Sequence, residues 1–222
     1  MKKSFAVIGL GRFGGAVVRE LAVSGQEVLA MDSNEDLVNQ FMNIASHAIV
    51  GNAQDETTLK QLGIRNFDIV VIAIGQDIQA SILVTLMVKE MGVKYVLAKA
   101  QNDYHARVLE KLGANLVVHP ESDMGIRAAH QLISNNLIEF LELSDKYSLG
   151  EVKLINSRLS GHTLAELDLP NQYKVNVTAI RRANGEVEFP NADTVVREKD
   201  SVLVVGRTVD VEYFDKHTTS KK

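Results

Sequence analysis

The stretch FAVIGLGRFG, residues 5–14, decides the fold of this chain. Its first four residues are apolar, which is typical of a short strand buried on both faces. Its last six fit G-x-G-x-x-G, and a helix-like stretch, residues 15–23, follows directly. A second strand-like segment ends at Asp32, about twenty residues after Gly11, the distance at which a ribose-binding acid is expected. Together these features form the dinucleotide-binding fingerprint.

Each part of this fingerprint has a physical reason. Gly9, Gly11 and Gly14 allow a tight turn, a close backbone approach to phosphate and close packing of the helix on the strand. The free N–H groups at the start of the helix then meet phosphate oxygens. Asp32 accepts hydrogen bonds from ribose hydroxyls, and its charge repels a 2′-phosphate, which disfavours NADP. A glycine turn without a ligand is the alternative interpretation.

Arg12 lies inside the phosphate loop and bears on the choice of nucleotide. A bridging diphosphate, as in NAD, already suits a helix terminus, whereas a terminal polyphosphate carries more charge and gains more from a cation. Arg12 therefore favours ATP or ADP. The alternatives are a solvated side chain or one paired with an acid of a neighbouring subunit.

Short apolar runs alternate with helix-like stretches through the first two thirds of the chain. The six expected strands are residues 5–8, 28–31, 48–50, 69–74, 95–98 and 116–118, and the expected helices are 15–23, 34–43, 56–62, 79–91, 103–112 and 123–133. Strands that are apolar on both faces and alternate with helices predict an α/β fold, a Rossmann-like doubly wound parallel sheet.

The pattern changes towards the C-terminus, which indicates a second, smaller α+β domain. Residues 137–143 and the polar residues after them read as a passage between domains. Strands are expected at 152–154, 175–181 and 201–205, with a hairpin turn at 183–186 and a short helix at 163–167. The sequence therefore predicts one domain over residues 1–143 and another over residues 144–222.

Composition excludes several classes of function. The 24 basic and 28 acidic residues give a net charge of −4, so no basic excess holds a nucleic acid polymer, and the absence of Trp leaves few stacking platforms. The absence of Cys excludes disulfides, iron–sulfur clusters and Cys-ligated zinc. The six His residues form no HExxH motif, and we expect no catalytic residues and no enzyme activity.

The apolar runs also bear on location. The run at residues 5–8 is interrupted at Gly9, too early for a signal peptide, and no apolar run approaches the roughly 20 residues that cross a bilayer. We therefore expect a cytoplasmic protein. Residues 79–91 are apolar almost all round the expected helix, which indicates burial against a second subunit or, alternatively, deep within the chain's own fold.

Six segments in order give the chain a resemblance to a known family: FAVIGLGRFG (5–14), VLAMDSNED (28–36), VGNAQDE (50–56), IVVIAIG (69–75), LAKAQNDYH (97–105) and VVHPESDMG (117–125). The chain resembles RCK proteins, the regulators of potassium conductance, and among them the regulatory subunits of bacterial Ktr-type potassium uptake systems. The resemblance covers nearly the whole chain.

The resemblance implies a cytosolic gating subunit, peripheral to the cell membrane. Such subunits form a homo-octameric ring beneath a membrane-embedded potassium-translocating subunit, and ATP and ADP give the ring different shapes. It implies that Arg12 reaches terminal phosphates and that Glu121 is the partner of a divalent cation such as Mg²⁺. The implied nucleotide-binding residues are Gly9, Gly11, Arg12, Phe13, Gly14, Asp32, Ser33, Asn34, Asn52, Ala53, Ile74, Gly75, Gln76, Lys99, Ala100, Gln101, His105 and Glu121.

Many of these positions follow an expected parallel strand, at the sheet edge where open α/β folds bind ligands. Simpler roles remain open at this point: Asn52 as a turn residue, Lys99 as a solvated strand-end cation, and Glu121 as a charge at a helix N-terminus.

The resemblance also implies a second ligand, because the family's C-terminal domain often binds one at a dimer interface, and in related Ktr subunits it is cyclic di-AMP. The implied contacts here are Val175, Asn176, Ile180, Arg181, Phe189 and Pro190. Apolar residues at strand spacing are also what a sheet core requires, so a core role is the alternative for these. Two other functions fit the glycine loop: an NAD-dependent oxidoreductase and an NAD(H)-sensing binding protein.

Overall fold

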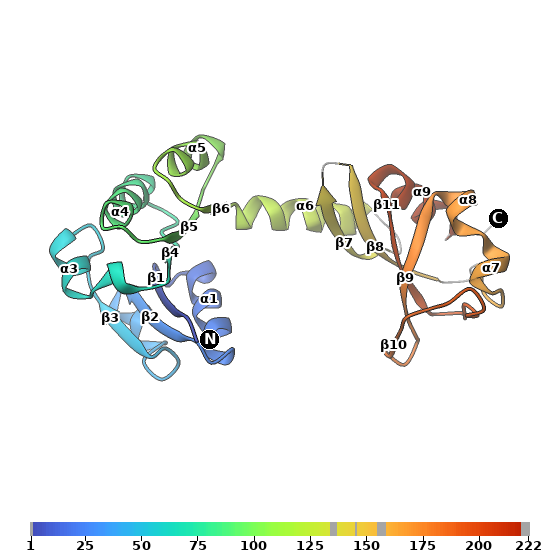
Figure 1. The fold of residues 1–222 in the computed structure, drawn as a ribbon, viewed down its shortest axis with the longest axis horizontal. Helices are drawn as coiled ribbons and strands as arrows, with labels where there is room; N and C mark the ends of the chain where they lie inside the picture. The colour runs from blue at the N-terminus through green and yellow to red at the C-terminus, as the bar shows by residue number, and fades with distance from the viewer. Residues whose placement is uncertain (1, 134–136, 145, 155–158, 219–222) are drawn as a thin grey trace. The chain divides into compact units, whose positions relative to one another are not determined.

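The structure of the chain, a computed structural model, describes residues 2–133, 137–144, 146–154 and 159–218. These residues form two compact units, one over residues 1–123 and one over residues 124–222. Each unit has its own sheet (Figure 1). The expected α/β fold with a second, smaller α+β part is confirmed.

The first unit contains a six-stranded sheet in the order β3-β2-β1-β4-β5-β6, and every strand pair in it is parallel. Its strands are β1 (Ser4–Ile8), β2 (Glu27–Asp32), β3 (His47–Val50), β4 (Ile69–Ile72), β5 (Tyr95–Lys99) and β6 (Leu116–Val118). Its helices are α1 (Arg12–Val23), α2 (Glu35–Asn39), α3 (Glu56–Gln61), the short η1 (Ile64–Asn66), α4 (Ile78–Glu90) and α5 (Asp103–Lys111), and α6 (Pro120–Ile133) follows β6.

Helices cover both faces of this sheet (Figure 1). Successive strand residues point to opposite faces, so Ile8 packs with Leu59, Val84 and Leu109 of α3, α4 and α5, whereas Val7 packs on the other face. The face that holds Val7 also receives α1 and α2. Burial on both faces explains why these strands are apolar throughout rather than alternating.

The glycine loop is clamped between β1, β4 and α1. Gly9 has φ of 96°, and a Cβ there would lie 2.9 Å from the backbone of Ala73, just beyond β4. A Cβ on Gly14 would lie 1.9 Å from the carbonyl oxygen of Gly9. At Gly11, by contrast, a Cβ would meet no protein atom within 4 Å. Packing therefore requires glycine at residues 9 and 14 and leaves open space beside Gly11.

Several element boundaries differ from those expected, and three of them in the first unit have a clear cause. Helix α1 starts at Arg12, directly after Gly11, because the loop residues themselves form the first turn. Strand β4 ends at Ile72, where the chain leaves the sheet beside Gly9. Helix α2 ends at Asn39, and the turns after it carry the buried ring of Phe41 against Gly15, so tertiary packing shortens the helix.

The second unit contains an antiparallel five-stranded sheet in the order β10-β9-β11-β8-β7 (Figure 1). Its strands are β7 (Leu137–Ser144), β8 (Tyr147–Lys153), β9 (Val175–Arg181), β10 (Val187–Glu188) and β11 (Ser201–Arg207), and its further helices are α7 (Leu164–Leu167), α8 (Leu169–Tyr173) and α9 (Thr208–Thr218). The expected turn between β9 and β10 is present: the backbone N–H of Arg182 donates to Glu186, and Gly185 has positive φ.

Residues 137–143 are not a passage between domains. They form most of β7, which pairs antiparallel with β8 and buries Phe140 in the second core. The compact units consequently divide after Asp123, earlier than the division between residues 143 and 144 that the sequence indicates. The strand depends on its partner β8, and residues 137–143 alone give no clear alternation of polar and apolar positions.

The glycine loop yields a matched pair of stability predictions. Gly14→Ala should lower the free energy of unfolding by about 3 kcal/mol, because the new methyl group collides with backbone that has little room to move. Gly11→Ala should change it by less than about 0.5 kcal/mol, since the methyl group enters open space. Urea unfolding followed by circular dichroism would measure both. Equal losses would contradict the packing described for the loop.

Candidate functional site

A pocket of about 630 Å³ lies where the strands of the first sheet end. This volume is in the range of small-molecule sites. The sheet order reverses between β1 and β4, and ligands of open α/β sheets bind at such a switch point. Of the expected site residues, those that line the pocket are Gly9, Gly11, Arg12, Phe13, Asp32, Ser33, Asn34, Asn52, Ala53, Ile74, Gly75, Gln76, Lys99 and Glu121.

Four expected site residues do not line this pocket. Gly14 packs against the backbone of Gly9 within the loop instead of lining the pocket. Ala100 and His105 are buried, and Gln101 is exposed. The Nδ1 atom of His105 accepts a hydrogen bond from the backbone N–H of Gln101 at 3.3 Å, so this ring holds the turn that follows β5.

The N-terminus of α1 is the part of the pocket best suited to an anion. Asn34, Asp55, Asp77 and Asn102 cap helices α2 to α5, each accepting a hydrogen bond from a backbone N–H of the first turn. Helix α1 has Gly11 at this position and no side-chain cap. Its first N–H groups therefore remain available to phosphate oxygens, and the helix dipole favours negative charge there.

Asp32 ties the second strand to the glycine loop. Its Oδ2 accepts a hydrogen bond from the backbone N–H of Leu10 at 2.6 Å, and its Oδ1 accepts one from Asn34 at 2.9 Å. Each carboxylate oxygen keeps a further lone pair, so the group can still accept hydroxyl donors from the pocket. Asp32 thus holds the loop in shape and presents an acceptor beside it.

Lys99 and Glu121 form an ion pair at the other side of the pocket, with 2.5 Å between Nζ and Oε1. The hydrogen bond from Lys99 is the main cause that holds the pKa of the Glu121 carboxyl below its usual value, and the charge of Arg12 adds to this. Lys99 is buried, so it is not the solvated strand-end cation that the sequence left open.

Asn52 combines two roles. Its side-chain oxygen accepts a hydrogen bond from the backbone N–H of Gln54 at 2.9 Å, which is the turn role that the sequence left open. The same residue lines the pocket.

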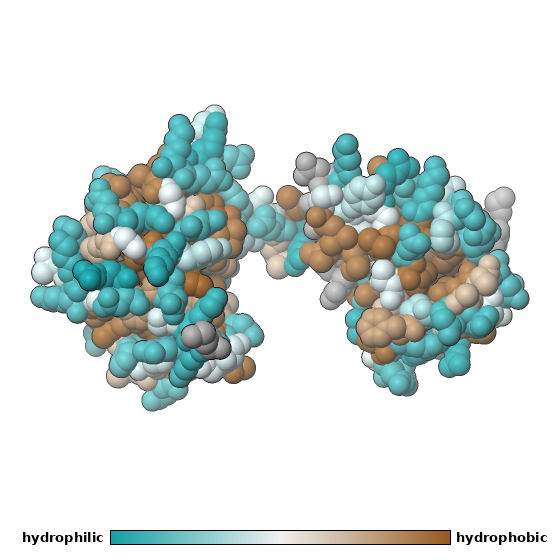
Figure 2. Space-filling view, in the orientation of Figure 1, coloured by the Kyte–Doolittle hydropathy of each residue, from teal (hydrophilic) through white to brown (hydrophobic). Residues whose placement is uncertain are grey.

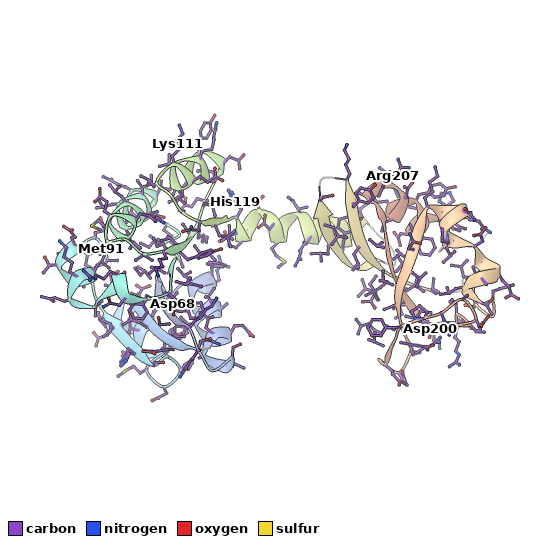
Figure 3. All side chains as sticks on the ribbon, in the orientation of Figure 1. Asp68, Met91, Lys111, His119, Asp200 and Arg207 are labelled. Carbon is purple, nitrogen blue, oxygen red and sulfur yellow. The ribbon has the colours of Figure 1, made fainter. Side chains whose placement is uncertain are left out.

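His105 is a buried histidine that follows the pocket residue Lys99 in the chain. Its pKa is lowered, first by burial and then by the charge of His119, so the neutral ring is favoured. His119 precedes Pro120 at the start of α6, where Figure 3 labels it. A neutral ring at residue 105 fits the acceptor role of its Nδ1 atom toward Gln101.

Several residues that line the pocket were not predicted from the sequence: Ile8, Met31, Leu37, Gly51, Gln54, Ala73, Asp77 and Ala80. For two of these residues, Gly51 and Asp77, the neighbouring sequence does indicate a place in the pocket. Gly51 directly precedes Asn52, and a Cβ on it would lie 2.9 Å from Met31, so this strand end needs glycine. Asp77 follows Gln76 and opens α4 as its cap.

Glu121 has limited capacity as a cation ligand. Among the residues that the structure describes, no three His, Cys, Asp or Glu side chains gather as a metal site. A single carboxylate together with phosphate oxygens is, however, an arrangement by which proteins hold Mg²⁺. The exposed carboxylate of Glu121 fits that use when a nucleotide supplies the remaining oxygen ligands.

The six residues expected to contact a second ligand do not share one environment. Val175 and Ile180 lie in the core of the second unit. Arg181 pairs with the buried Glu151 through Nε at 2.8 Å, while Phe189 is exposed. A nearby pocket of about 490 Å³ is lined by Arg182 and Asp200, the second labelled in Figure 3, and by none of the six. Their contact with a ligand stays a prediction.

Within the described ranges, no helix is long and apolar enough to span a membrane.

Comparison with known proteins identifies the two units. Residues 5–120 match the TrkA-N domain and residues 149–218 match the TrkA-C domain. The chain is 50% identical over 222 residues to Ktr system potassium uptake protein C of Bacillus subtilis, with all of both chains covered. It is 44% identical over 204 residues to Ktr system potassium uptake protein A of Vibrio alginolyticus, covering 92% of each.

Solved structures agree on the fold. The GsuK RCK domain matches with a TM-score of 0.69 at 14% identity, and the match covers 100% of this chain and 49% of that one. This chain therefore spans about half the length of the GsuK chain. The TrkA-N domain of the Escherichia coli inner membrane protein ybaL matches with a TM-score of 0.54 at 17% identity, covering 60% of this chain and 98% of that one.

The resemblance drawn from the sequence segments is thereby confirmed. The chain belongs to the RCK family, with its TrkA-N and TrkA-C domains, among the regulatory subunits of Ktr potassium uptake systems.

Proposed function

We propose that this chain is the cytosolic gating subunit of a potassium transporter, and that ATP and ADP compete for the pocket of the first unit. The observation that carries the proposal is the uncapped N-terminus of α1, which faces a pocket that also holds Arg12 and Asp32. The loop's N–H groups and Arg12 receive phosphates, and Asp32 receives the ribose.

Arg12 is the reason to prefer ATP and ADP over a dinucleotide. It is the exposed first residue of α1, so its guanidinium can follow phosphate oxygens that extend beyond the helix terminus. A terminal phosphate carries more charge than a bridging one and gains more from this cation. The guanidinium reaches the terminal phosphates of its own nucleotide or those of a neighbouring subunit's nucleotide.

Gating requires no turnover. A nucleotide shifts the equilibrium between two shapes of an assembly only by the difference in its affinity for them. ATP and ADP differ in the phosphate that lies nearest Arg12, Lys99 and Glu121, and this difference is what the membrane partner would respond to. Glu121 would hold a divalent cation such as Mg²⁺ together with the phosphates. We propose no catalytic role for the chain.

Assembly into a ring of identical subunits, eight in the family pattern, would cover apolar surface that one chain leaves exposed. Leu83 and Leu86 lie on the outer side of α4, each more than a third exposed. A groove of about 620 Å³ that includes Leu97 and Leu116 lies along the sheet of the same unit. Figure 2 shows apolar side chains that interrupt the hydrophilic surface of both units.

Helix α6 gives separate support for assembly. Residues 121–129 are all exposed, although this helix carries Met124 and Ile126. A helix of this length is marginal in water when most of its described side chains are exposed. A second copy that packs on α6 would supply the missing burial.

Two further parts of the proposal concern other ligands. Cyclic di-AMP would bind the second unit and inhibit uptake, through contacts at Val175, Asn176, Ile180, Arg181, Phe189 and Pro190. NAD(H) sensing is the alternative at the first site, because Asp32 and the parallel sheet suit a dinucleotide equally. A GsuK channel of the same fold is described as bound to NAD, so NADH belongs among the probes.

Calorimetry on the purified chain tests the proposal. ATP and ADP should bind more tightly than NADH. We expect Gly11→Ala to fold normally. It should weaken the binding of ATP and of ADP by at least about tenfold, because a methyl group in the open space beside the loop displaces phosphate from charge-assisted hydrogen bonds. Tighter binding of NADH than of ATP would favour the sensing alternative, and turnover of NADH with a carbonyl substrate would favour an oxidoreductase.

Arg12→Ala should weaken the binding of ATP by about tenfold and the binding of ADP by less, because the terminal phosphate loses a charge-assisted hydrogen bond. Arg65→Ala is the matched control, because Arg65 is an exposed arginine of the same unit outside the pocket. An equal loss for ATP and ADP in Arg12→Ala, measured by calorimetric titration, would contradict the role given to Arg12.

The double variant Leu83→Glu/Leu86→Glu should reduce the mass of the assembly, because two charges would enter an apolar interface. Light scattering after gel filtration measures that mass. Val23→Glu is the control, since Val23 is 84% exposed at the end of α1. An unchanged mass in the double variant would show that α4 does not contribute to the interface.

A further inference from the structure

The ammonium group of Lys99 lies beside Gly75, in the pocket that the glycine loop also lines. Lys99 is the last residue of β5, and its Nζ is so close to Gly75 that a Cβ there would be 3.2 Å away. Gly75 follows β4, which is the strand next to β1. The glycine loop packs on Ala73, two residues before Gly75, so the ammonium group and the loop line the same pocket.

The ion pair that Lys99 makes is asymmetric. Its side chain is 11% exposed, whereas the Glu121 side chain is 63% exposed. A charge withdrawn from water needs a counter-charge, so the pair matters more to the lysine than to the glutamate. The pair Lys60–Glu56, at 2.8 Å on the surface of α3, has both side chains more than half exposed and lies outside the pocket.

A terminal phosphate beside Gly75 would offer Lys99 a second anion. Phosphate carries more charge than a carboxylate and presents several acceptor oxygens. A phosphate chain that starts on the N–H groups of α1 must extend across the pocket to reach this point, which a triphosphate does more readily than a diphosphate. Once Lys99 turns to the phosphate, Glu121 loses its ion-pair partner and its carboxylate becomes available.

We propose that Lys99 is a latch that blocks Glu121 as a cation ligand until a terminal phosphate draws the ammonium group away. The proposal rests on the nucleotide binding proposed above and adds the order of events at the site. A divalent cation and the terminal phosphate then bind cooperatively, and by linkage each strengthens the other equally. A nucleotide whose chain ends short of Gly75 leaves the latch closed.

Binding of Mn²⁺, followed by electron paramagnetic resonance of the free ion, tests the latch on the nucleotide-free protein. Lys99→Met should raise Mn²⁺ affinity by about tenfold, because the carboxylate no longer has to give up a charge-assisted hydrogen bond. Lys99→Met/Glu121→Gln should return the affinity to that of the wild type. Equal affinity in the wild type and Lys99→Met would overturn the proposal.

Two controls separate contact from a general field effect. Arg12 also lowers the pKa of Glu121, but by charge alone, so Arg12→Ala should raise Mn²⁺ affinity less than Lys99→Met does. Lys60→Met breaks a pair of the same chemistry outside the pocket and should change nothing. An increase in Arg12→Ala as large as that in Lys99→Met would overturn the latch in favour of a field effect.

Binding of Mn·ATP and Mn·ADP tests whether a terminal phosphate releases Glu121 from Lys99. Glu121→Gln should weaken the binding of Mn·ATP by about tenfold and leave the binding of Mn·ADP nearly unchanged, because the triphosphate frees the carboxylate and the diphosphate does not. Equal weakening of the two would overturn the release by a terminal phosphate. If the wild type binds neither nucleotide, the proposed function fails, while the Mn²⁺ comparison without nucleotide still decides whether Lys99 blocks Glu121.

Discussion

The structure of the first unit depends on a backbone-to-backbone contact between the glycine loop and the end of β4. Gly9 touches Ala73, and Gly14 touches Gly9, with no room for a side chain at either contact. These contacts fix the start of α1 where the sheet order reverses, between β1 and β4. The pocket follows from this topology, because helices leave in opposite directions on either side of that point.

The charges of the pocket are arranged so that the site is stable before a ligand arrives. It holds three carboxylates and two cations, and each carboxylate already has a partner. Asp32 accepts from two backbone N–H groups, Asp77 caps α4, and Glu121 accepts from Lys99. The start of α1 and the exposed Arg12 remain as the positive part. A phosphate that bound here as proposed would meet donors and little uncompensated negative charge, which is the form of preorganisation that reduces the free-energy cost of binding.

Local sequence predicts the parts of this molecule whose cause is local. The six strands of the first unit, the glycine loop and Asp32 follow from residue types at fixed spacing, and the structure brings most of the expected site residues to one pocket. Features that depend on distant partners were not predicted. Residues 137–143 form a strand because β8 pairs with them, and α2 ends early because Phe41 packs on Gly15.

The candidate site also has features that depend on distant partners and do not follow from local sequence. Lys99 and Glu121 were each expected there from the family resemblance, but nothing in their spacing indicates that one neutralises the other. Their pairing needs the ends of β5 and β6 to lie side by side, with α6 starting directly beyond. The burial of His105 is similar, since only the fold turns that ring inward to support Gln101.

The position of Glu121 connects the pocket to the rest of the chain. Glu121 lies in the first turn of α6, and α6 is the element through which the chain passes from the first unit to the second. A carboxylate at a helix N-terminus interacts with the helix dipole, so a change in its partner changes the electrostatics of that first turn. Because residues 121–129 are exposed, little packing within the chain opposes a response of this helix. A nucleotide bound as proposed would therefore change the partner of a residue in the first turn of α6, where a modest difference in binding energy can shift a helix that few side-chain contacts hold.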